Sequence, residues 1–219
     1  MGLAAMRVLL FSGGLDSTAL AWWQRPDACL FVDYGQRPAA GERAAATSIA
    51  AEFGLRLETL QVDLSGLGLG PLAGGEPAAL ARAPEWWPYR NQILVTLAGM
   101  RFVAEGLSEI LIGTVATDVH ADGRAPFLRT LDRLMRLQEG GVRVVAPARH
   151  LSGPALLAAS GLPASALGAT FSCHVMEYAC GQCRGCEKHR ETLRSFGLRS
   201  DVKASRAAPD RPDAARAEG

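Results

Sequence analysis

Val8-Leu9-Leu10-Phe11-Ser12-Gly13-Gly14-Leu15-Asp16-Ser17-Thr18 is the stretch that decides the fold. An apolar run ends in a Ser-Gly-Gly turn and passes directly into a helical pattern. This order predicts a buried parallel strand that leads into the N-terminus of a helix. Glycines allow the backbone to turn sharply, and free N–H groups at the positive end of a helix favour an anion. The turn is therefore a candidate phosphate site.

The side chains of this turn suit a phosphate group that is bridged by a metal ion. Ser12, Ser17 and Thr18 carry hydroxyl donors. Asp16 would repel bare phosphate, but its carboxylate suits a magnesium ion that bridges two phosphates. A plain helix N-cap after a Gly-rich turn has the same pattern, so the residues alone leave both interpretations open.

The composition narrows the class of protein. The chain has 219 residues, 48% hydrophobic and 21% charged, which predicts one α/β domain over 1–203, with a disordered tail at 204–219. The net charge of +1 shows no excess of basic residues of the kind that is typical of nucleic-acid binding. No membrane span or signal peptide is recognisable, so we expect a cytoplasmic protein. A Walker-type NTPase is excluded because its loop needs a lysine, and Lys188 and Lys203 lie far from any such loop.

The alternation of apolar runs and helical patterns predicts a doubly wound, parallel, five-stranded sheet. Strands are expected over 6–12, 28–33, 55–62, 109–113 and 142–146. Helices are expected over 16–24, 39–53, 91–105, 124–139, 153–161, 163–167 and 187–196. Residues 63–85 show no clear period and are predicted to form a long mobile loop or lid, with a short helix at 77–82. Ligands bind beyond the carboxyl ends of such strands, where Asp33, Gly113 and Thr114 lie.

An aromatic segment, Glu85-Trp86-Trp87-Pro88-Tyr89-Arg90-Asn91-Gln92, follows the long loop. Aromatic rings and an arginine beside a lid are able to stack on a planar ligand. A packed hydrophobic corner fits the composition equally well, so both interpretations stay open.

Four cysteines lie close together in the spacing C-x6-C-x2-C-x2-C: Cys173, Cys180, Cys183 and Cys186. Clustered cysteines in a reducing compartment indicate a metal rather than disulfides. Four thiolates suit tetrahedral zinc, and the absence of a C-P element after the last cysteine favours zinc over an iron–sulfur cluster. Four protein ligands close the coordination shell, so the metal is expected to be structural and to anchor the helix at 187–196. His174 and His189 are expected to lie beside the site without binding the metal.

The Ser12–Ser17 turn resembles the SGGxDS pyrophosphate loop of the N-type ATP pyrophosphatases, an adenine nucleotide alpha-hydrolase-like fold. Together with the Asp33–Arg37 segment, the turn at Pro88–Asn91, the Gly113–Asp118 segment and the four cysteines, it resembles the 7-cyano-7-deazaguanine synthase family over residues 7 to about 198. The resemblance implies a homodimer, a zinc-bound segment at 171–198, and ATP and magnesium as co-reactants. It also implies a reaction: 7-carboxy-7-deazaguanine is adenylated, captured by ammonia as an amide, and dehydrated to the nitrile with a second ATP.

The resemblance also suggests roles for individual residues. Catalysis is expected from Ser12, Asp16 and Ser17. Nucleotide binding is expected from Phe11, Ser12, Gly13, Gly14, Leu15, Asp16, Ser17, Thr18, Asp33 and Gly113. Substrate binding is expected from Trp87, Arg90, Asn91, Thr117 and Asp118, because a carboxylate accepts two parallel donors from a guanine-like edge.

Three segments depart from the family pattern. Tyr89 replaces the glycine of a Pro-Gly-Arg-Asn turn. Residues 119–124 lack the family's Ser-Gly-Tyr-Pro-Asp-Cys-Arg stretch. Ser-Gly-Pro-Ala at 152–155 replaces Asp-Lys-Ala-Glu and removes a lysine expected near phosphate, for whose charge Arg149 or Arg143 is the expected substitute.

Other functions stay open beside the nitrile synthase. The altered segments favour a paralogue that stops at the amide and joins the deazaguanine carboxylate to another amine, such as a protein N-terminus in antiphage defence. The missing lysine favours a non-catalytic module that binds nucleotide. Thiolation of tRNA by the same loop type is disfavoured, because the clustered cysteines suit zinc better and the charge is near neutral.

Overall fold

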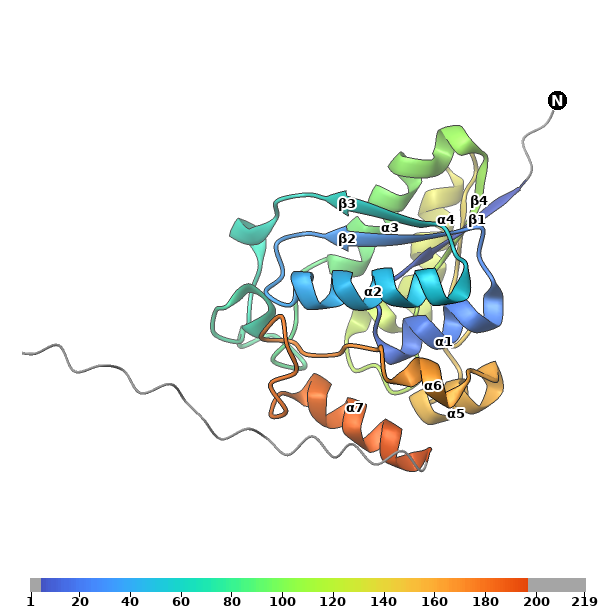
Figure 1. Ribbon diagram of the computed structural model, residues 1–219. Coiled ribbons are helices and arrows are strands. Elements are labelled where there is room, and N and C mark those ends of the chain that lie inside the picture. Colours follow the sequence, from blue (N-terminus) through green and yellow to red (C-terminus); the bar gives the residue numbers. More distant parts are fainter. Residues whose placement is uncertain (1–4, 197–219) are drawn as a thin grey trace, which may run out of the picture.

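A five-stranded, all-parallel sheet forms the centre of the molecule, in the order β3-β2-β1-β4-β5 (Figure 1). The structure is a computed structural model that describes residues 5–196. The strands are β1 (Met6–Leu10), β2 (Ala28–Asp33), β3 (Leu57–Gln61), β4 (Leu107–Leu111) and β5 (Arg143–Val145). The chain leaves the central β1 through β2 and β3 on one side and through β4 and β5 on the other. This confirms the predicted doubly wound topology and places a switch point between β1 and β4.

Seven α-helices in residues 5–196 surround the sheet: α1 (Leu15–Gln24), α2 (Ala39–Phe53), α3 (Arg90–Phe102), α4 (Ala125–Arg136), α5 (Gly153–Ser160), α6 (Ala164–Leu167) and α7 (Arg184–Ser195). Short 3-10 turns occupy Ser65–Leu67, Pro71–Ala73, Val103–Glu105 and Ala121–Gly123. In Figure 1, α1 and α2 cover one face of the sheet, α3 and α4 lie behind the other, and α7 lies below with α5 and α6. None of the helices within the described range is long and apolar enough to cross a membrane.

The central strands are apolar on both faces because helices cover both. Leu9 and Phe31 belong to the core with α1, α2 and α5, whereas Val8 and Leu30 belong to the core with α3 and α4. The edge strand β3 contains both apolar and polar residues and is half-exposed. The alternation of side chains along each strand therefore divides the apolar residues between two cores.

The long segment between β3 and α3 differs from the prediction in one respect. The helix expected at 77–82 was wrong: a single turn closes, with the Ala81 N–H donating to the Ala78 carbonyl. Pro84 disfavours a helical backbone at Ala83, so the segment ends early, and so short a stretch is marginal as a helix on its own. The buried Leu72 instead attaches the segment to the core. The mobility of this segment stays a prediction, and the tail predicted at 204–219 lies outside the described residues.

Candidate functional site

A cavity of about 740 Å³ opens beyond the carboxyl ends of the central strands. Its volume lies within the usual range for small-molecule sites. Its wall combines the Gly-rich turn after β1, the segments that follow β2 and β4, the start of α3, and the inner side of α7. Its position at the switch point of the sheet is where a doubly wound fold binds its ligands.

The Gly-rich turn has the shape that the sequence predicted. Gly13 has φ of +73°, and a Cβ atom there would lie 2.6 Å from the backbone nitrogen of Ala46, so no other residue fits without a shift. Gly14 caps α1, and its N–H donates to Ser12 Oγ at 3.3 Å. Ser17 Oγ donates to the Gly14 carbonyl at 3.1 Å and lies 3.3 Å from Ser12 Oγ. Both hydroxyls therefore lie at the positive end of α1, where an anion is favoured.

Most of the predicted nucleotide residues lie in or against this wall. Phe11, Ser12, Gly14, Leu15, Asp16, Ser17 and Gly113 line the cavity. Thr18 is fully buried beneath it, and within the described part of the chain its Oγ1 finds no hydrogen-bond partner. Asp33 lies outside the wall, where its Oδ1 accepts the Gly35 N–H at 3.2 Å. Its role in nucleotide binding stays a prediction.

Asp16 has a partner that the sequence did not suggest. Lys188 Nζ, on α7, lies 3.1 Å from Asp16 Oδ2, and both residues line the cavity. The arginines expected to replace a missing lysine lie elsewhere: Arg143 pairs with Glu109 at 2.9 Å, and Arg149 lines a separate hollow. That expectation was wrong, because both arginines lie away from the cavity wall.

The segment after β4 supplies the predicted guanine-edge residues. Thr117 and Asp118 both line the cavity. Asp118 Oδ2 accepts the Val115 N–H at 3.0 Å, which leaves Oδ1 to accept from a ligand. Burial raises the pKa of the Asp118 carboxyl above its usual value. A ligand that donates to this group would compensate for the buried charge.

The start of α3 presents two of the three substrate residues that were predicted in this part of the chain. Arg90 and Asn91 line the cavity, and Asn91 Nδ2 donates to the Asp122 carbonyl at 3.4 Å. Trp87 is instead 3% exposed and packs edge-on against Tyr34, with ring centroids 4.9 Å apart. Trp87 therefore forms the hydrophobic corner that the sequence left open, and stacking on a ligand would require it to move.

A buried polar group at one end of the cavity was missed by the sequence reasoning. Glu42 accepts from Gln36 Nε2 at 2.9 Å, and Arg90 lies close to Tyr34 and Glu42. Burial raises the pKa of the Glu42 carboxyl, and it raises that of Tyr34 to about 12. Glu42 stands in the first turn of an alanine-rich helix, and its sequence neighbours give no signal of a site.

A second missed group lies where the chain departs from the family pattern. Glu85 Oε1 accepts from Arg184 Nη1 at 2.8 Å and lies 4.0 Å from His120 Nε2. His174 lines the same part of the wall. Burial lowers the pKa of both imidazoles, which therefore favour the neutral form. This end of the cavity offers neutral histidines and an acid–arginine pair, which suit proton transfer to or from a reacting amine.

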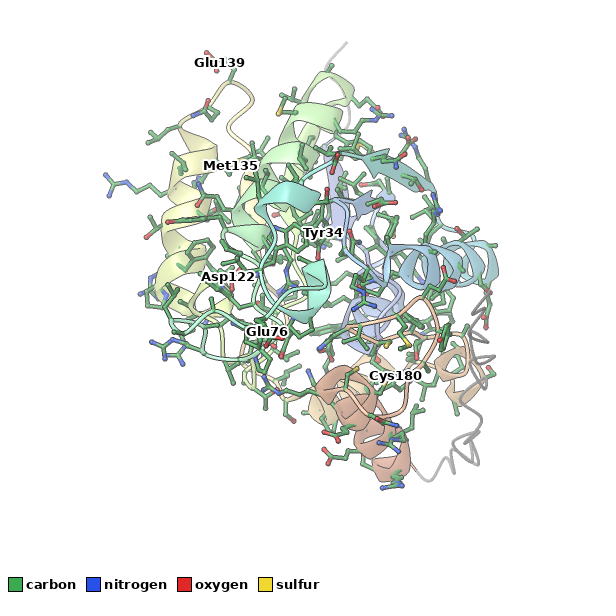
Figure 2. The ribbon with its side chains drawn as sticks, turned by 90° about the vertical axis from the view of Figure 1, so that its left-hand side faces the viewer. Tyr34, Glu76, Asp122, Met135, Glu139 and Cys180 are labelled. Atoms are coloured by element: carbon green, nitrogen blue, oxygen red, sulfur yellow. The ribbon has the colours of Figure 1, made fainter. Side chains whose placement is uncertain are left out.

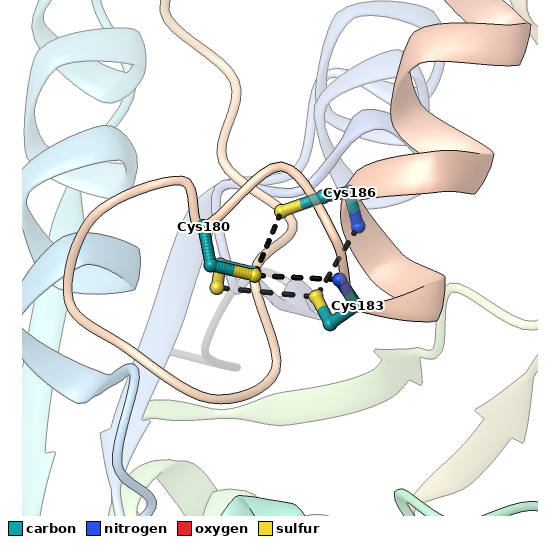
Figure 3. A group of neighbouring side chains, drawn as sticks. Cys180, Cys183 and Cys186 are labelled. Atoms are coloured by element: carbon teal, nitrogen blue, oxygen red, sulfur yellow. Dashed lines mark hydrogen bonds between the residues drawn. The ribbon is translucent and has the colours of Figure 1, made fainter. Parts of the chain in front are cut away.

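The four cysteines meet in a cluster beside α7 (Figure 3). Their sulfur atoms lie within 4.8 Å of one another, and Cys173–Cys183 and Cys180–Cys186 are each separated by 3.9 Å. Tetrahedral zinc with four thiolates places its sulfurs about 3.8 Å apart, so the residues fit the metal. Figure 2 shows Cys180 near α7, at the lower end of the molecule.

The backbone around the cluster supports bound metal. The N–H groups of His174, Cys183 and Cys186 donate to cysteine sulfurs at 3.3–3.5 Å. Such bonds orient the ligands and stabilise their charge. Cys183 also caps α7, so the helix begins at Arg184, three residues before the predicted start at 187. His189 hydrogen-bonds Thr170 instead of joining the cluster.

Comparisons with known proteins identify the family of this chain. The family model described as "Queuosine biosynthesis protein QueC" matches residues 6–197. Three similar proteins are named 7-cyano-7-deazaguanine synthase or 7-cyano-7-deazaguanine synthase 1. The one from Thiobacillus denitrificans is 32% identical, covering 91% of this chain and 98% of that protein. Those from Pseudomonas paraeruginosa and Desulfitobacterium hafniense are 31% and 30% identical, covering 87% and 85% of this chain and 94% and 90% of theirs.

A solved structure shares the fold. It is titled as a predicted subunit of tRNA methyltransferase from Methanocaldococcus jannaschii, and it aligns with a TM-score of 0.50 and 14% identity over 89% of both chains. At that identity the likeness concerns the fold alone. The family model and the three relatives, each spanning most of this sequence, show that the chain belongs to the QueC family of queuosine biosynthesis proteins.

Proposed function

We propose that this protein uses ATP to adenylate 7-carboxy-7-deazaguanine and then joins the activated carboxyl group to ammonia, giving 7-cyano-7-deazaguanine. The observation that carries the proposal is the Gly-rich turn at the mouth of a 740 Å³ cavity, in a chain of the QueC family. Relatives that cover most of this chain are named for synthesis of that nitrile.

The chemistry needs a leaving group, because a carboxylate is a poor electrophile. A substrate carboxylate oxygen attacks the α-phosphorus of ATP, and the bond to the β-phosphate breaks as pyrophosphate leaves. The N–H groups and hydroxyls of Ser12–Ser17, which lie at the wall of the cavity, would stabilise that growing negative charge. Magnesium, held by Asp16, would neutralise further phosphate charge.

The acyl group is then transferred to nitrogen. Ammonia attacks the carbonyl carbon, AMP leaves with the oxygen, and loss of a proton gives the amide. A second ATP adenylates the amide oxygen, AMP departs with that oxygen, and loss of two protons leaves the nitrile. His120 and Glu85 both line the cavity and are our candidates for taking up these protons.

ATP–pyrophosphate exchange that depends on the carboxylated base tests the activation step. We expect exchange in the wild type and its loss in Asp16→Asn, with fold and zinc content unchanged. Full exchange in that variant would refute the phosphate-site assignment. No exchange in the wild type would favour a module that only binds nucleotide.

The altered segment at 119–124 favours one alternative, a paralogue that stops at the amide with a different amine. His120 in that segment lies in the wall of the cavity. Incubation with ATP, the acid and ammonia, followed by mass spectrometry, distinguishes the two outcomes. Quantitative nitrile supports the synthase, whereas adenylate without nitrile supports the paralogue. We also propose that the protein is a homodimer, which light scattering after size exclusion measures directly.

A further inference from the structure

Lys188 contacts the proposed phosphate site from a helix that the cysteine cluster holds in place. It is the only lysine in residues 5–196. Its Nζ lies 3.1 Å from Asp16 Oδ2, although 172 positions separate the two residues in the sequence. The Lys188 side chain is 47% exposed, so the ammonium group is free to move from Asp16 into the cavity that both residues line.

The space beside Asp16 is left open for this lysine by a glycine. Gly153 begins α5, and a Cβ atom at that position would lie 3.3 Å from Asp16 Oδ1 and 4.0 Å from Lys188 Cε. A long side chain at 153 would therefore compete with Lys188 for the same space. Gly153 also stands at the lysine position of the Asp-Lys-Ala-Glu pattern that this chain lacks. Lys188 thus brings a positive charge to the Asp16 carboxylate from a different element.

The start of α7 determines where Lys188 lies. Cys183 caps the helix and Cys186 is in its first turn, two residues before Lys188. Gly185 packs so closely that a Cβ atom there would clash with the Ser172 carbonyl. The metal-binding cluster therefore fixes the origin of the Lys188 side chain.

We propose that Lys188 is a phosphate-binding residue of the adenylation site and that the cysteine cluster positions it. The ammonium group rests on Asp16 before nucleotide binds. When Mg·ATP binds, its magnesium ion competes with the Lys188 ammonium group for the Asp16 carboxylate. Lys188 Nζ then turns to the phosphate oxygens and afterwards to the departing pyrophosphate. Lysine is a common point-charge ligand for phosphate. This inference rests on the proposed adenylation.

The test compares Lys188→Gln with Arg194→Gln, which removes a positive charge from an exposed position in the last turn of the same helix. We expect Lys188→Gln to weaken Mg·ATP binding, measured by calorimetry, by tenfold or more. We also expect it to lower pyrophosphate exchange by roughly 10²-fold, with zinc content and Tm unchanged. Arg194→Gln should leave all four quantities unchanged.

A rescue variant separates a phosphate role from a general effect on α7. The double variant Gly153→Lys with Lys188→Gln returns a lysine to Asp16 from α5, and we expect it to recover at least a tenth of the wild-type exchange. Binding and exchange in Lys188→Gln within twofold of the wild type would overturn the Lys188 assignment and leave the adenylation intact. If the wild type shows no exchange, the proposed reaction fails, and Mg·ATP binding by the variants still decides the role of Lys188.

Discussion

Tyr89 takes a backbone conformation that is unfavourable for its side chain. It precedes α3 with φ of +55° and ψ of 17°, and the residue is 75% exposed, so little packing compensates. The left-handed region costs a non-glycine residue about 1 kcal/mol or more. We therefore expect Tyr89→Gly to raise the free energy of unfolding relative to Tyr89→Ala by about 0.5–1 kcal/mol. Urea denaturation measures both, and a less stable glycine variant would contradict the strain.

Trp87 distinguishes packing from substrate binding at the aromatic corner. Its side chain is buried against Tyr34, whereas the neighbouring Trp86 is only half-buried. Truncation of a buried aromatic costs about 3–5 kcal/mol. We expect Trp87→Ala to lose stability on that scale and Trp86→Ala to lose clearly less, in thermal and urea unfolding. Equal losses of stability in the two variants would mean that burial of Trp87 does not stabilise this hydrophobic corner.

Glu42 should make stability depend on pH. Burial raises its folded-state pKa, so the folded protein binds this proton more tightly than the unfolded chain. The contribution to stability is fully present at low pH and is lost as pH rises through the folded pKa. Glu42→Gln keeps an acceptor for Gln36 and removes the titration. The variant should gain stability over the wild type at pH 8 relative to pH 5, in paired urea titrations. If the variant and the wild type differ in stability by the same amount at pH 5 and at pH 8, this prediction is refuted.

At the scale of elements, the cysteine cluster and α7 form one unit. Removing one of four thiolates should release the metal, and structural zinc contributes folding energy through its ligands. Cys29 is the matched control, because it is buried in β2 and burial raises its pKa to about 12. We expect Cys173→Ala to lose bound zinc and Cys29→Ala to retain it, measured by elemental analysis. Loss of protease resistance in α7 should accompany only the first variant, and zinc loss in both would contradict the assignment.

The elements that could be predicted from sequence are those with a local signal. The β1–turn–α1 unit and the cysteine cluster each lie within a short stretch, where the local pattern predicts the structure and, for the cysteines, a possible metal site. The helix expected at 77–82 was wrong because Pro84 ends so short a segment before its alanines can form a regular helix. Lys188 and Glu42 could not be found in this way. Their contacts with Asp16 and Arg90 depend on how α7 and α2 pack against the sheet, which no local pattern describes.

At the scale of the whole molecule, the cavity joins parts of the chain that otherwise pack on different elements. The Gly-rich turn belongs to the sheet and α1, whereas Lys188 and Arg184 belong to α7 beside the cysteine cluster. Direct packing of α7 involves α5 more than the sheet. A ligand in the cavity would therefore bridge the sheet and the segment that carries the four cysteines, and its binding energy would stabilise both together.

Nucleotide binding should show this coupling. A ligand at one hundred times its Kd adds about 2.7 kcal/mol, which raises Tm by roughly 5–10 °C for a chain of this size. We expect Mg·ATP to produce that shift and to slow hydrogen exchange in α7 as well as in residues 12–18. The Asp16→Asn variant should lose most of the part of this Tm shift that depends on magnesium. Protection confined to residues 12–18 would show that α7 does not take part in nucleotide binding, because a ligand that contacts Lys188 must restrain the helix that carries it.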